Sequence, residues 1–183
     1  MTPEKLLHSN ETLCDKSPRE VIEWAIGQTE GRAIVSTNFR PYEAVILYLV
    51  TQVQPDIPVL WVDHGYNRKA TYKHAEELRK LLNLNIHAFV PQLTAAHYDA
   101  VHGGMPEPVE ENEEAIKAFS TIMKLEPFQR GMKELVPTVW FTALRKVQNP
   151  NRAELDIVSA DNNFNFPNIS SSFGRCSIEI HLL

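Results

Sequence analysis

Residues 32–63, RAIVSTNFRPYEAVILYLVTQVQPDIPVLWVD, decide the fold. The run from Arg32 to Thr37 is rich in β-forming residues, and from Tyr42 to Val53 apolar residues recur at helical spacing. Prolines then interrupt the chain, and the apolar run from Val59 to Asp63 is typical of a strand buried on both faces. The stretch therefore predicts a strand, a helix and a second strand in succession.

The same alternation continues on both sides of this unit. The segment Ser17-Pro18-Arg19-Glu20 predicts the start of an earlier helix, because Ser17 and Glu20 form a capping box and proline suits the first helical position. A helix over 70–82 and a strand over 85–90 follow. Strands that alternate with helices of this length predict right-handed crossovers and a parallel sheet with helices on both faces, which is the α/β class.

The second half of the chain is less regular. The regular pattern fails over residues 91–112, where the glycines and prolines from Gly103 to Pro108 predict a loop and the acidic run from Glu110 to Glu114 follows. Further helices are expected over about 113–122 and 127–135, and further strands over 138–142 and 155–158. Beyond residue 160 the sequence has no period, and Ile178 to Leu183 is either a short edge strand or a loose end. We therefore expect an α/β domain over residues 1–160 and an atypical C-terminal tail over 161–183.

Composition excludes several classes of function. The formal net charge of -5 argues against a general nucleic-acid binder. The apolar runs are shorter than the roughly 20 residues that span a bilayer, and the first ten residues lack the apolar core of a secretion signal, so we expect a cytoplasmic protein without membrane contact. The two cysteines, Cys14 and Cys176, lie far apart and the seven histidines form no ligand pair, so no metal is predicted.

Polar residues follow three of the expected strands, where ligands bind in an open parallel sheet. Hydroxyl and amide side chains of segment 36–40 favour an anion site at a helix start, or they cap the helix. Asp63 is suited to accept hydrogen bonds from a sugar or an adenine amine, or it organises a turn that Gly65 permits. Arg145 and Arg152 suit bidentate contacts with phosphate or sulfate, or they are solvated surface charges.

These motifs together resemble the sulfonucleotide reductases, which act on phosphoadenylyl sulfate (PAPS) or adenylyl sulfate (APS). The resemblance covers about residues 33–158 and rests on STNF at 36–39, WVDHGY at 61–66, KLEPFQR at 124–130, WFTALR at 140–145, and Tyr72, Arg152 and Leu155. It implies an adenine nucleotide α-hydrolase-like fold with a mainly parallel five-stranded sheet, and an adenine-nucleotide-binding domain over 1–160. The substrate-binding residues that the resemblance implies are Ser36, Thr37, Asn38, Phe39, Asp63, Gly65, Tyr66, Arg145 and Arg152.

The resemblance also implies a reaction. In the family a cysteine thiolate attacks the sulfur of PAPS, leaving adenosine bisphosphate, and thioredoxin or glutaredoxin then releases sulfite, a step of assimilatory sulfate reduction and cysteine biosynthesis. The APS-using branch carries a Cys-Cys pair before its Lys-x-Glu-Pro motif, and this chain has Thr121-Ile122-Met123 at that position. The resemblance therefore implies no iron–sulfur cluster, and the PAPS branch is the better match. No other cofactor is expected.

The chain departs from the family pattern in its last segment. The Glu-Cys-Gly-x-His motif is not present, and we expect a chain truncated at its C-terminus. Cys176, with His181 five residues later, is the candidate nucleophile, or an unrelated tail cysteine. Arg40 stands where the family has glycine, and it either adds a phosphate contact or crowds the turn. His64 replaces a small hydroxyl residue.

Two other functions stay open beside a PAPS reductase. One is a non-catalytic nucleotide-binding module, and the other is an ATP pyrophosphatase-type adenylating enzyme. The missing loop glycines of a Ser-Gly-Gly motif count against the latter. A homodimer is possible because a shortened α/β domain exposes apolar surface.

Overall fold

The computed structural model describes residues 3–29, 32–142, 156–160, 171–173 and 176–182. The α-helices are α1 (Pro3–Leu13), α2 (Pro18–Gly27), α3 (Ala44–Val53), α4 (Lys69–Leu82), α5 (Ala95–His102), α6 (Glu113–Ser120) and α7 (Glu126–Leu135). Short helical turns are η1 (Pro41–Glu43), η2 (Glu110–Asn112) and η3 (Thr121–Leu125). The strands are β1 (Ala33–Thr37), β2 (Pro58–Val62), β3 (Asn85–Phe89), β4 (Val139–Thr142), β5 (Val158–Ala160), β6 (Ser171–Phe173) and β7 (Cys176–Leu182).

One sheet organises the described chain, with strand order β3-β2-β1-β4-β7-β5 and β6 paired with β7. Strands β1 to β4 are parallel, and β7 is antiparallel to β4, so the α/β class and the mainly parallel sheet are confirmed. Within the ranges that the structure describes, the sheet holds seven strands instead of the expected five, because β6 and β7 join it. The expectation of an edge strand or a loose end for the last residues is wrong, since β7 lies between β4 and β5.

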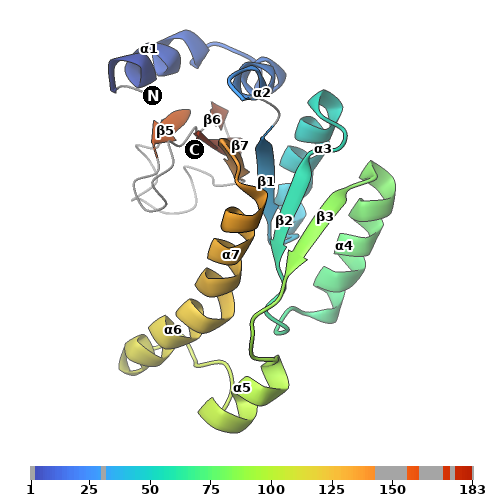
Figure 1. Ribbon diagram of the computed structural model, residues 1–183, viewed down its shortest axis with the longest axis vertical. Helices are drawn as coiled ribbons and strands as arrows, with labels where there is room; N and C mark the ends of the chain where they lie inside the picture. Colours follow the sequence, from blue (N-terminus) through green and yellow to red (C-terminus); the bar gives the residue numbers. More distant parts are fainter. Residues whose placement is uncertain (1–2, 30–31, 143–155, 161–170, 174–175, 183) are drawn as a thin grey trace.

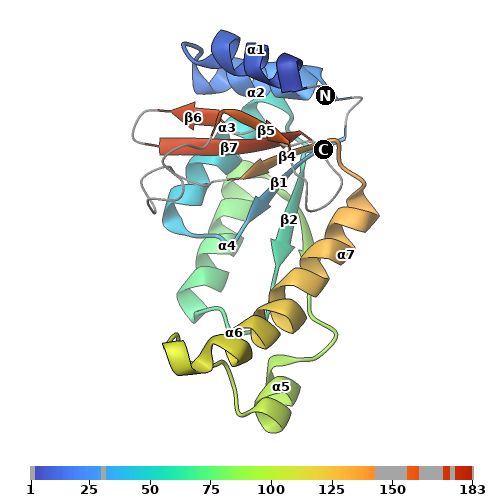
Figure 2. The ribbon, with the colours of Figure 1, turned by 90° about the vertical axis from the view of Figure 1, so that its left-hand side faces the viewer.

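Helices cover both faces of the sheet (Figures 1 and 2). On one face, α2, α3 and α4 pack on β1, β2 and β4 through the largest buried cluster, which contains Ile22, Leu47, Val35 and Phe141. On the other face, α7 packs through Met132 against residues of β1, β2 and β3. The alternation of side chains along each strand produces these two cores, because successive residues point to opposite faces.

A close approach fixes α7 against the sheet. Gly131 is buried, and a Cβ atom added there would lie 2.9 Å from side-chain atoms of Leu60 and Phe89. The helix follows α6 through η3, a π-helical turn, so the two helical pieces expected from the sequence form one continuous structure. Single π-turns inside helices often mark functional sites, because they shift the side chains that follow.

The predicted capping box is confirmed at the start of α2, where Ser17 and Glu20 exchange their backbone and side-chain hydrogen bonds. The predicted loop over Gly103 to Pro108 is confirmed, but α5 forms just before it, in a stretch for which no element was predicted. Thr94 caps this helix by accepting a hydrogen bond from the His97 N–H, and Gly103 ends it in the left-handed conformation. The eight-residue helix has a weak apolar period, which glycine and proline downstream obscured in the sequence.

Helix α1 protects β5. The Asn10 side chain donates to the Val158 carbonyl at 2.8 Å and accepts from the Val158 N–H at 2.7 Å. The amide therefore takes the place of a neighbouring strand for this buried residue.

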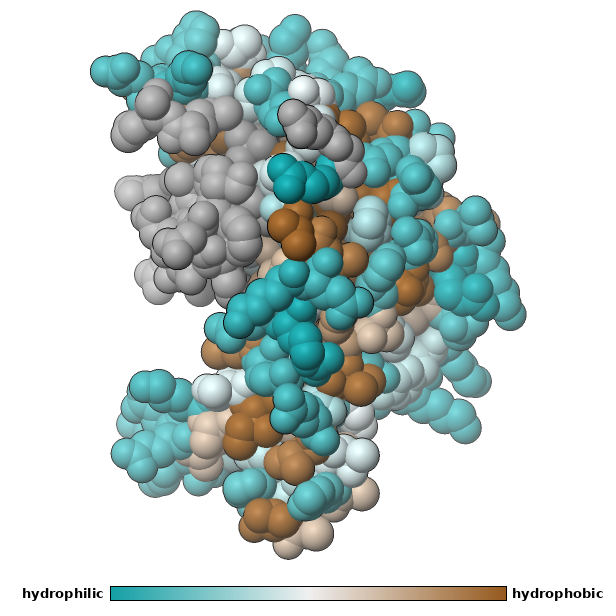
Figure 3. Space-filling view, viewed as in Figure 1, coloured by the Kyte–Doolittle hydropathy of each residue, from teal (hydrophilic) through white to brown (hydrophobic). Residues whose placement is uncertain are grey.

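Parallel strands β1 to β3 end near α5 and α6, and α1 and α2 lie at the opposite end of the molecule (Figure 1). On the face drawn in Figure 3, hydrophilic residues separate the exposed apolar residues into patches over α7 and over the α5–α6 end. No helix in the described ranges is long and apolar enough to cross a membrane. The possible homodimer stays a prediction.

Candidate functional site

The candidate site lies at the carboxyl edge of the sheet. Strand β1 has β2 on one side and β4 on the other, and the chain passes from β1 first to β2 and later to β4. The direction of the connections therefore reverses beside β1, and open α/β sheets bind ligands at such a point. The turns after β1 and β2 both end at this edge.

The turn after β1 is held by its own side chains. Phe39 has a positive φ of 54° and is buried, with its ring edge-on to Trp61 at 5.0 Å between centroids. A non-glycine residue in this conformation is strained, and burial of the aromatic ring compensates for the strain. The Phe39 N–H donates to Thr37 Oγ1 at 2.9 Å, so Thr37 closes the turn from inside.

Glu43 in η1 completes this turn. Its Oε2 atom accepts hydrogen bonds from the Thr37 hydroxyl at 2.7 Å, the Asn38 N–H at 2.6 Å and the Arg40 N–H at 3.3 Å. Donors that an external anion would use at a helix start are thus already bound to an internal carboxylate. The backbone of the turn is consequently preformed, with the Asn38 and Arg40 side chains exposed.

The turn after β2 is organised by Asp63. Its Oδ1 atom accepts from the Gly65 N–H at 3.1 Å, from the Asn67 amide at 3.2 Å and from the Tyr72 hydroxyl at 2.7 Å. Burial, together with the hydrogen bond to Asp63, raises the pKa of Tyr72 to about 12. Tyr72 therefore stays a neutral donor that joins α4 to the turn.

His64 faces the site as a neutral imidazole. Its Nδ1 atom accepts the Tyr66 N–H at 3.1 Å, so the ring carries its proton on Nε2. Burial and the nearby charge of Lys124 lower the pKa of His64 below its usual value, which keeps the ring neutral near pH 7. The side chain thus offers an N–H donor and no charge.

Gly65 and Tyr66 tie the same turn to α5. Gly65 has a φ of 77°, and a Cβ added there would lie 3.0 Å from the Ala95 Cβ. The Tyr66 hydroxyl donates to Asp99 Oδ1 at 2.6 Å, and its ring packs edge-on to Phe119 at 5.4 Å. These contacts hold the α5–α6 end of the molecule against the strand ends.

The opposite wall comes from η3 and α7. Lys124 lies in η3 with its Nζ 5.4 Å from the centre of the Phe119 ring. Phe128 packs on Trp140 at 5.0 Å, and the Trp140 indole N–H donates to Ser36 Oγ at 2.8 Å. The end of β1 is in this way linked to β4 and to α7.

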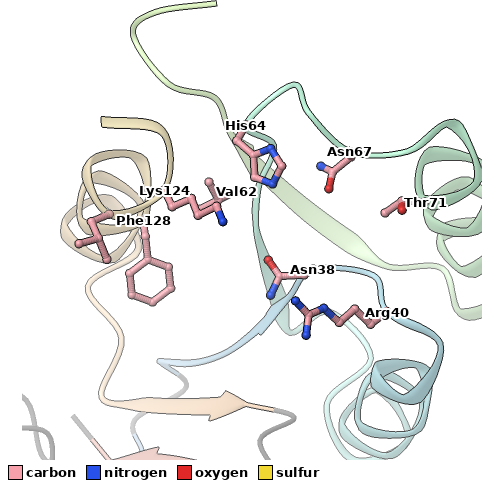
Figure 4. A pocket seen from close by; sticks show the side chains of 9 residues that line it. Asn38, Arg40, Val62, His64, Asn67, Thr71, Lys124 and Phe128 are labelled. Carbon is pink, nitrogen blue, oxygen red and sulfur yellow. The ribbon is translucent and has the colours of Figure 1, made fainter. Parts of the chain in front are cut away.

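A cavity of about 370 Å³ lies between these walls (Figure 4). Its lining residues are Asn38, Arg40, Val62, His64, Asn67, Thr71, Lys124, Leu125 and Phe128. Two of them, Arg40 and Lys124, are cationic, and none of these nine residues carries a carboxylate. Because an uncompensated pair of cations attracts anions, the cavity is suited to a negatively charged ligand that also has an apolar part.

A second cavity of about 500 Å³ lies beside α5 and α6 and has a different character. Its lining includes Tyr98, His102 and Glu107, and no lysine or arginine is among the described residues that form it. The larger cavity therefore lacks the positive charge that an anionic ligand requires.

The structure distributes the residues predicted for the site over several roles. Asn38 lines the cavity, whereas Ser36, Thr37 and Phe39 hold the turn beside it. Ligand contacts of Asp63, Gly65 and Tyr66 stay predictions, and none of the three lines the cavity. Arg145 and Arg152 lie outside the described residues.

Cys176 is the first residue of β7. The antiparallel register pairs Thr142 with Glu179, so β7 begins on the carboxyl side of the parallel strands. Cys176 precedes Glu179 by three positions, which corresponds to about 10 Å of extended chain. The backbone of Cys176 thus belongs to the same edge as the turns after β1 and β2. Cys14, in contrast, directly follows α1 at the opposite end (Figure 1).

Sequence reasoning did not assign His64, Asn67, Thr71, Lys124 and Phe128 to the site, and it gave a phosphate contact as only one of two interpretations for Arg40. Signals existed for some of them: Arg40 and His64 stood out as departures from the family pattern, and Lys124 and Phe128 belong to a quoted motif. Within the described ranges, no group of three or more histidine, cysteine, aspartate or glutamate side chains is arranged to hold a metal ion.

Comparisons with known proteins agree with this architecture. The phosphoadenosine 5'-phosphosulfate reductase of Synechococcus sp. is 35% identical over 153 residues, which cover 84% of this chain and 65% of that protein. The enzyme of the same name from Vibrio parahaemolyticus is 37% identical over 158 residues, or 86% and 60% of the two chains. The chain therefore spans less than two thirds of the length of these curated relatives.

A solved structure is similar over most of the fold. The crystal structure of phosphoadenylyl-sulfate (PAPS) reductase from Candida auris, a phosphate complex, superposes with a TM-score of 0.77 at 22% identity, covering 92% of this chain and 78% of that one. The model of the phosphoadenosine phosphosulfate reductase domain matches residues 32–177, which include both turns and every residue that lines the cavity. On this match, and on the identity to its relatives, the chain belongs to the phosphoadenosine phosphosulfate reductase family.

Proposed function

We propose that this chain binds 3'-phosphoadenylyl sulfate, or its product adenosine 3',5'-bisphosphate, in the cavity between the turn after β1 and η3. The observation that carries the proposal is the charge of this cavity, which has Arg40 and Lys124 in its walls and no carboxylate among its lining residues. Its volume of about 370 Å³ is in the usual range for small-molecule sites.

The remaining walls suit the parts of a nucleotide. Phe128, Val62 and Leu125 offer apolar surface for a purine ring. The Asn67 amide and the Thr71 hydroxyl are suited to hydrogen bonds with a ribose, and the His64 N–H is a neutral donor. A ligand with an aromatic base, a sugar and several anionic groups would therefore find a partner for each part.

The reaction that follows binding is the transfer of a sulfo group from the nucleotide to a cysteine thiolate. A cysteine thiolate attacks the sulfur of the sulfuryl group, a sulfur–sulfur bond forms, and the bond between that sulfur and the phosphate oxygen breaks, so that adenosine 3',5'-bisphosphate leaves. A dithiol of the thioredoxin or glutaredoxin type then attacks the S-sulfonate, is oxidised to a disulfide and releases sulfite. In this scheme the protein needs no iron–sulfur cluster and serves sulfate assimilation in the cytoplasm.

Cys176 is our candidate for the nucleophile in this chain. Its support is the register of β7, which starts at the carboxyl edge of the sheet beside the candidate site. Cys14 has no such support, because it follows α1 at the other end of the molecule.

Calorimetric titration with adenosine 3',5'-bisphosphate tests the binding part. We expect one site per chain and a loss of affinity of about 30-fold in Lys124→Ala, since one charge-assisted contact disappears. Lys117→Ala is the matched control, because Lys117 is exposed on α6 and does not line the cavity. Absence of binding by the unmodified chain, or equal losses in both variants, would refute the site.

A thioredoxin-coupled sulfite assay tests the catalytic part separately. We expect sulfite from the unmodified chain and from Cys14→Ser, and none from Cys176→Ser. Binding of the bisphosphate without any sulfite release would refute catalysis by this chain and favour a non-catalytic nucleotide-binding module.

A further inference from the structure

The turn after β1 carries two different groups of hydrogen-bond donors. The backbone N–H groups of Asn38 and Arg40 are bound to the Glu43 carboxylate at 2.6 and 3.3 Å, and the Thr37 hydroxyl is bound to the same oxygen. Glu43 itself does not line the cavity. An anion in the cavity therefore does not find these backbone donors available.

The Arg40 side chain is the second group, and it extends along the cavity wall (Figure 4). Arg40 is exposed, and the ion pairs found among the described residues do not include it. The positive charge on this wall consequently comes from a side chain instead of from the turn backbone. A guanidinium group offers a planar fork of donors that matches phosphate or sulfate oxygens.

Lys124 lies on the opposite wall with Phe128, as Figure 4 shows. A ligand with a single anionic group would neutralise one of the two cations and leave the other without a partner. A ligand with two separate anionic groups would neutralise both. The arrangement therefore distinguishes ligands by the number and the separation of their anionic groups.

We propose that Arg40 is a specificity-determining residue, which selects adenine nucleotides that carry a second anionic group in addition to the one bound at Lys124. Glu43 is its positioning residue, because it fixes the backbone from which the Arg40 side chain extends. This inference rests on the proposed function and deepens it, since it names the residue that recognises the second anionic group of the ligand.

The test compares three ligands by calorimetry: adenosine 3'-monophosphate, adenosine 5'-monophosphate and adenosine 3',5'-bisphosphate. Arg40→Ala should lower the affinity for the bisphosphate by about 30-fold and the affinity for only one of the two monophosphates. Lys124→Ala should lower the affinity for the other monophosphate. In Arg40→Ala the bisphosphate should then bind no more than about threefold more tightly than the monophosphate that is held at Lys124.

Two variants serve as controls for Arg40. Arg40→Lys keeps the charge without the planar fork and should retain part of the preference for the bisphosphate. Arg79→Ala removes the same charge from an exposed ion pair with Glu76 on α4 and should change none of the three affinities.

The positioning role of Glu43 has its own readout. Glu43→Ala should reduce the preference for the bisphosphate over the Lys124-bound monophosphate, and Glu43→Gln should restore it, because the glutamine oxygen accepts the same bonds. Should Glu43→Ala fail to fold, Thr37→Val, which removes one donor to Glu43, is measured in its place with Thr37→Ser as its control.

The outcomes separate the two proposals. If the unmodified chain binds none of the three ligands, the proposed function fails. If it binds them and Arg40→Ala changes all three affinities equally, or changes none by more than about twofold, the role of Arg40 is overturned while the proposed function stands.

Discussion

Replacement of Glu43 by alanine is the sharpest test of how the turn after β1 is built. The variant removes an oxygen that accepts three hydrogen bonds, two of them short at 2.6 and 2.7 Å and one longer at 3.3 Å. Hydrogen bonds to a charged partner contribute about 1.5–3 kcal/mol each to stability. Because Asn38 is exposed and its N–H regains water, we expect about 2–3 kcal/mol in total rather than the full sum.

Urea unfolding followed by circular dichroism measures this loss. The free energy of unfolding of Glu43→Ala should fall by that amount at an unchanged slope against urea. Glu43→Gln, which keeps an acceptor oxygen but loses the charge, should lose only about 1 kcal/mol. A loss below about 0.5 kcal/mol in Glu43→Ala would show that the carboxylate does not hold the turn.

Three further variants test the fold around the site. Gly131→Ala should destabilise the protein by about 1–3 kcal/mol in urea unfolding, because its Cβ would meet side chains of β2 and β3 at 2.9 Å. Gly27→Ala, where nothing lies within 4 Å of the added Cβ, should not, and equal effects would refute the close approach. Asn10→Ala should lower the thermal midpoint through a loss of about 2 kcal/mol, because two backbone groups of β5 lose their partner. The Thr12 hydroxyl donates to the His8 carbonyl within α1, so Thr12→Ala should have little effect. A larger loss of stability in Thr12→Ala than in Asn10→Ala would contradict the role of α1. The pKa of His64 is lowered from 6.5 in the folded protein, so the unfolded chain binds the proton more readily. The free energy of unfolding therefore falls as the pH drops below 6.5. His64→Asn should remove this part of the loss of stability. If the free energy of unfolding depends on pH in the same way in His64→Asn and in the unmodified protein between pH 7.5 and 5, the contribution of His64 is refuted.

The sequence predicts the strands and helices of this fold well wherever an element has its own period. The helix over Tyr42 to Val53 and the strand over Val59 to Asp63 are observed within a few residues as α3 and β2. For β7 the sequence shows the alternation of Ile178, Ile180 and Leu182, but it does not show that the strand lies between β4 and β5. Strand order depends on pairing between segments that are distant in the sequence, and a local pattern contains no information about this pairing.

The site shows the same limit at the level of single side chains. Asn38 was predicted because it follows a strand, which is a local property. Glu43 was missed because its approach to Thr37 depends on the positive φ of Phe39 between them. Lys124 was visible as part of a motif, but its position on the cavity wall depends on the π-helical turn η3, and no sequence rule predicted that turn.

One arginine and one histidine illustrate the opposite case, in which a departure from the family's sequence pattern was informative. Arg40 and His64 both drew attention because other residue types were expected there, and both line the cavity. A polar residue at an unexpected position near a strand end is therefore a useful signal for a site, even before its contacts are known.

The proposed function depends on the binding of a polyanionic adenine nucleotide between Arg40 and Lys124. A crystal structure of the full chain grown with adenosine 3',5'-bisphosphate tests it most directly. We expect the ligand at the carboxyl edge of the sheet, with one anionic group on Arg40 and another on Lys124. A bisphosphate bound elsewhere, such as in the cavity beside Tyr98 and His102, would show that Arg40 and Lys124 do not form the binding site.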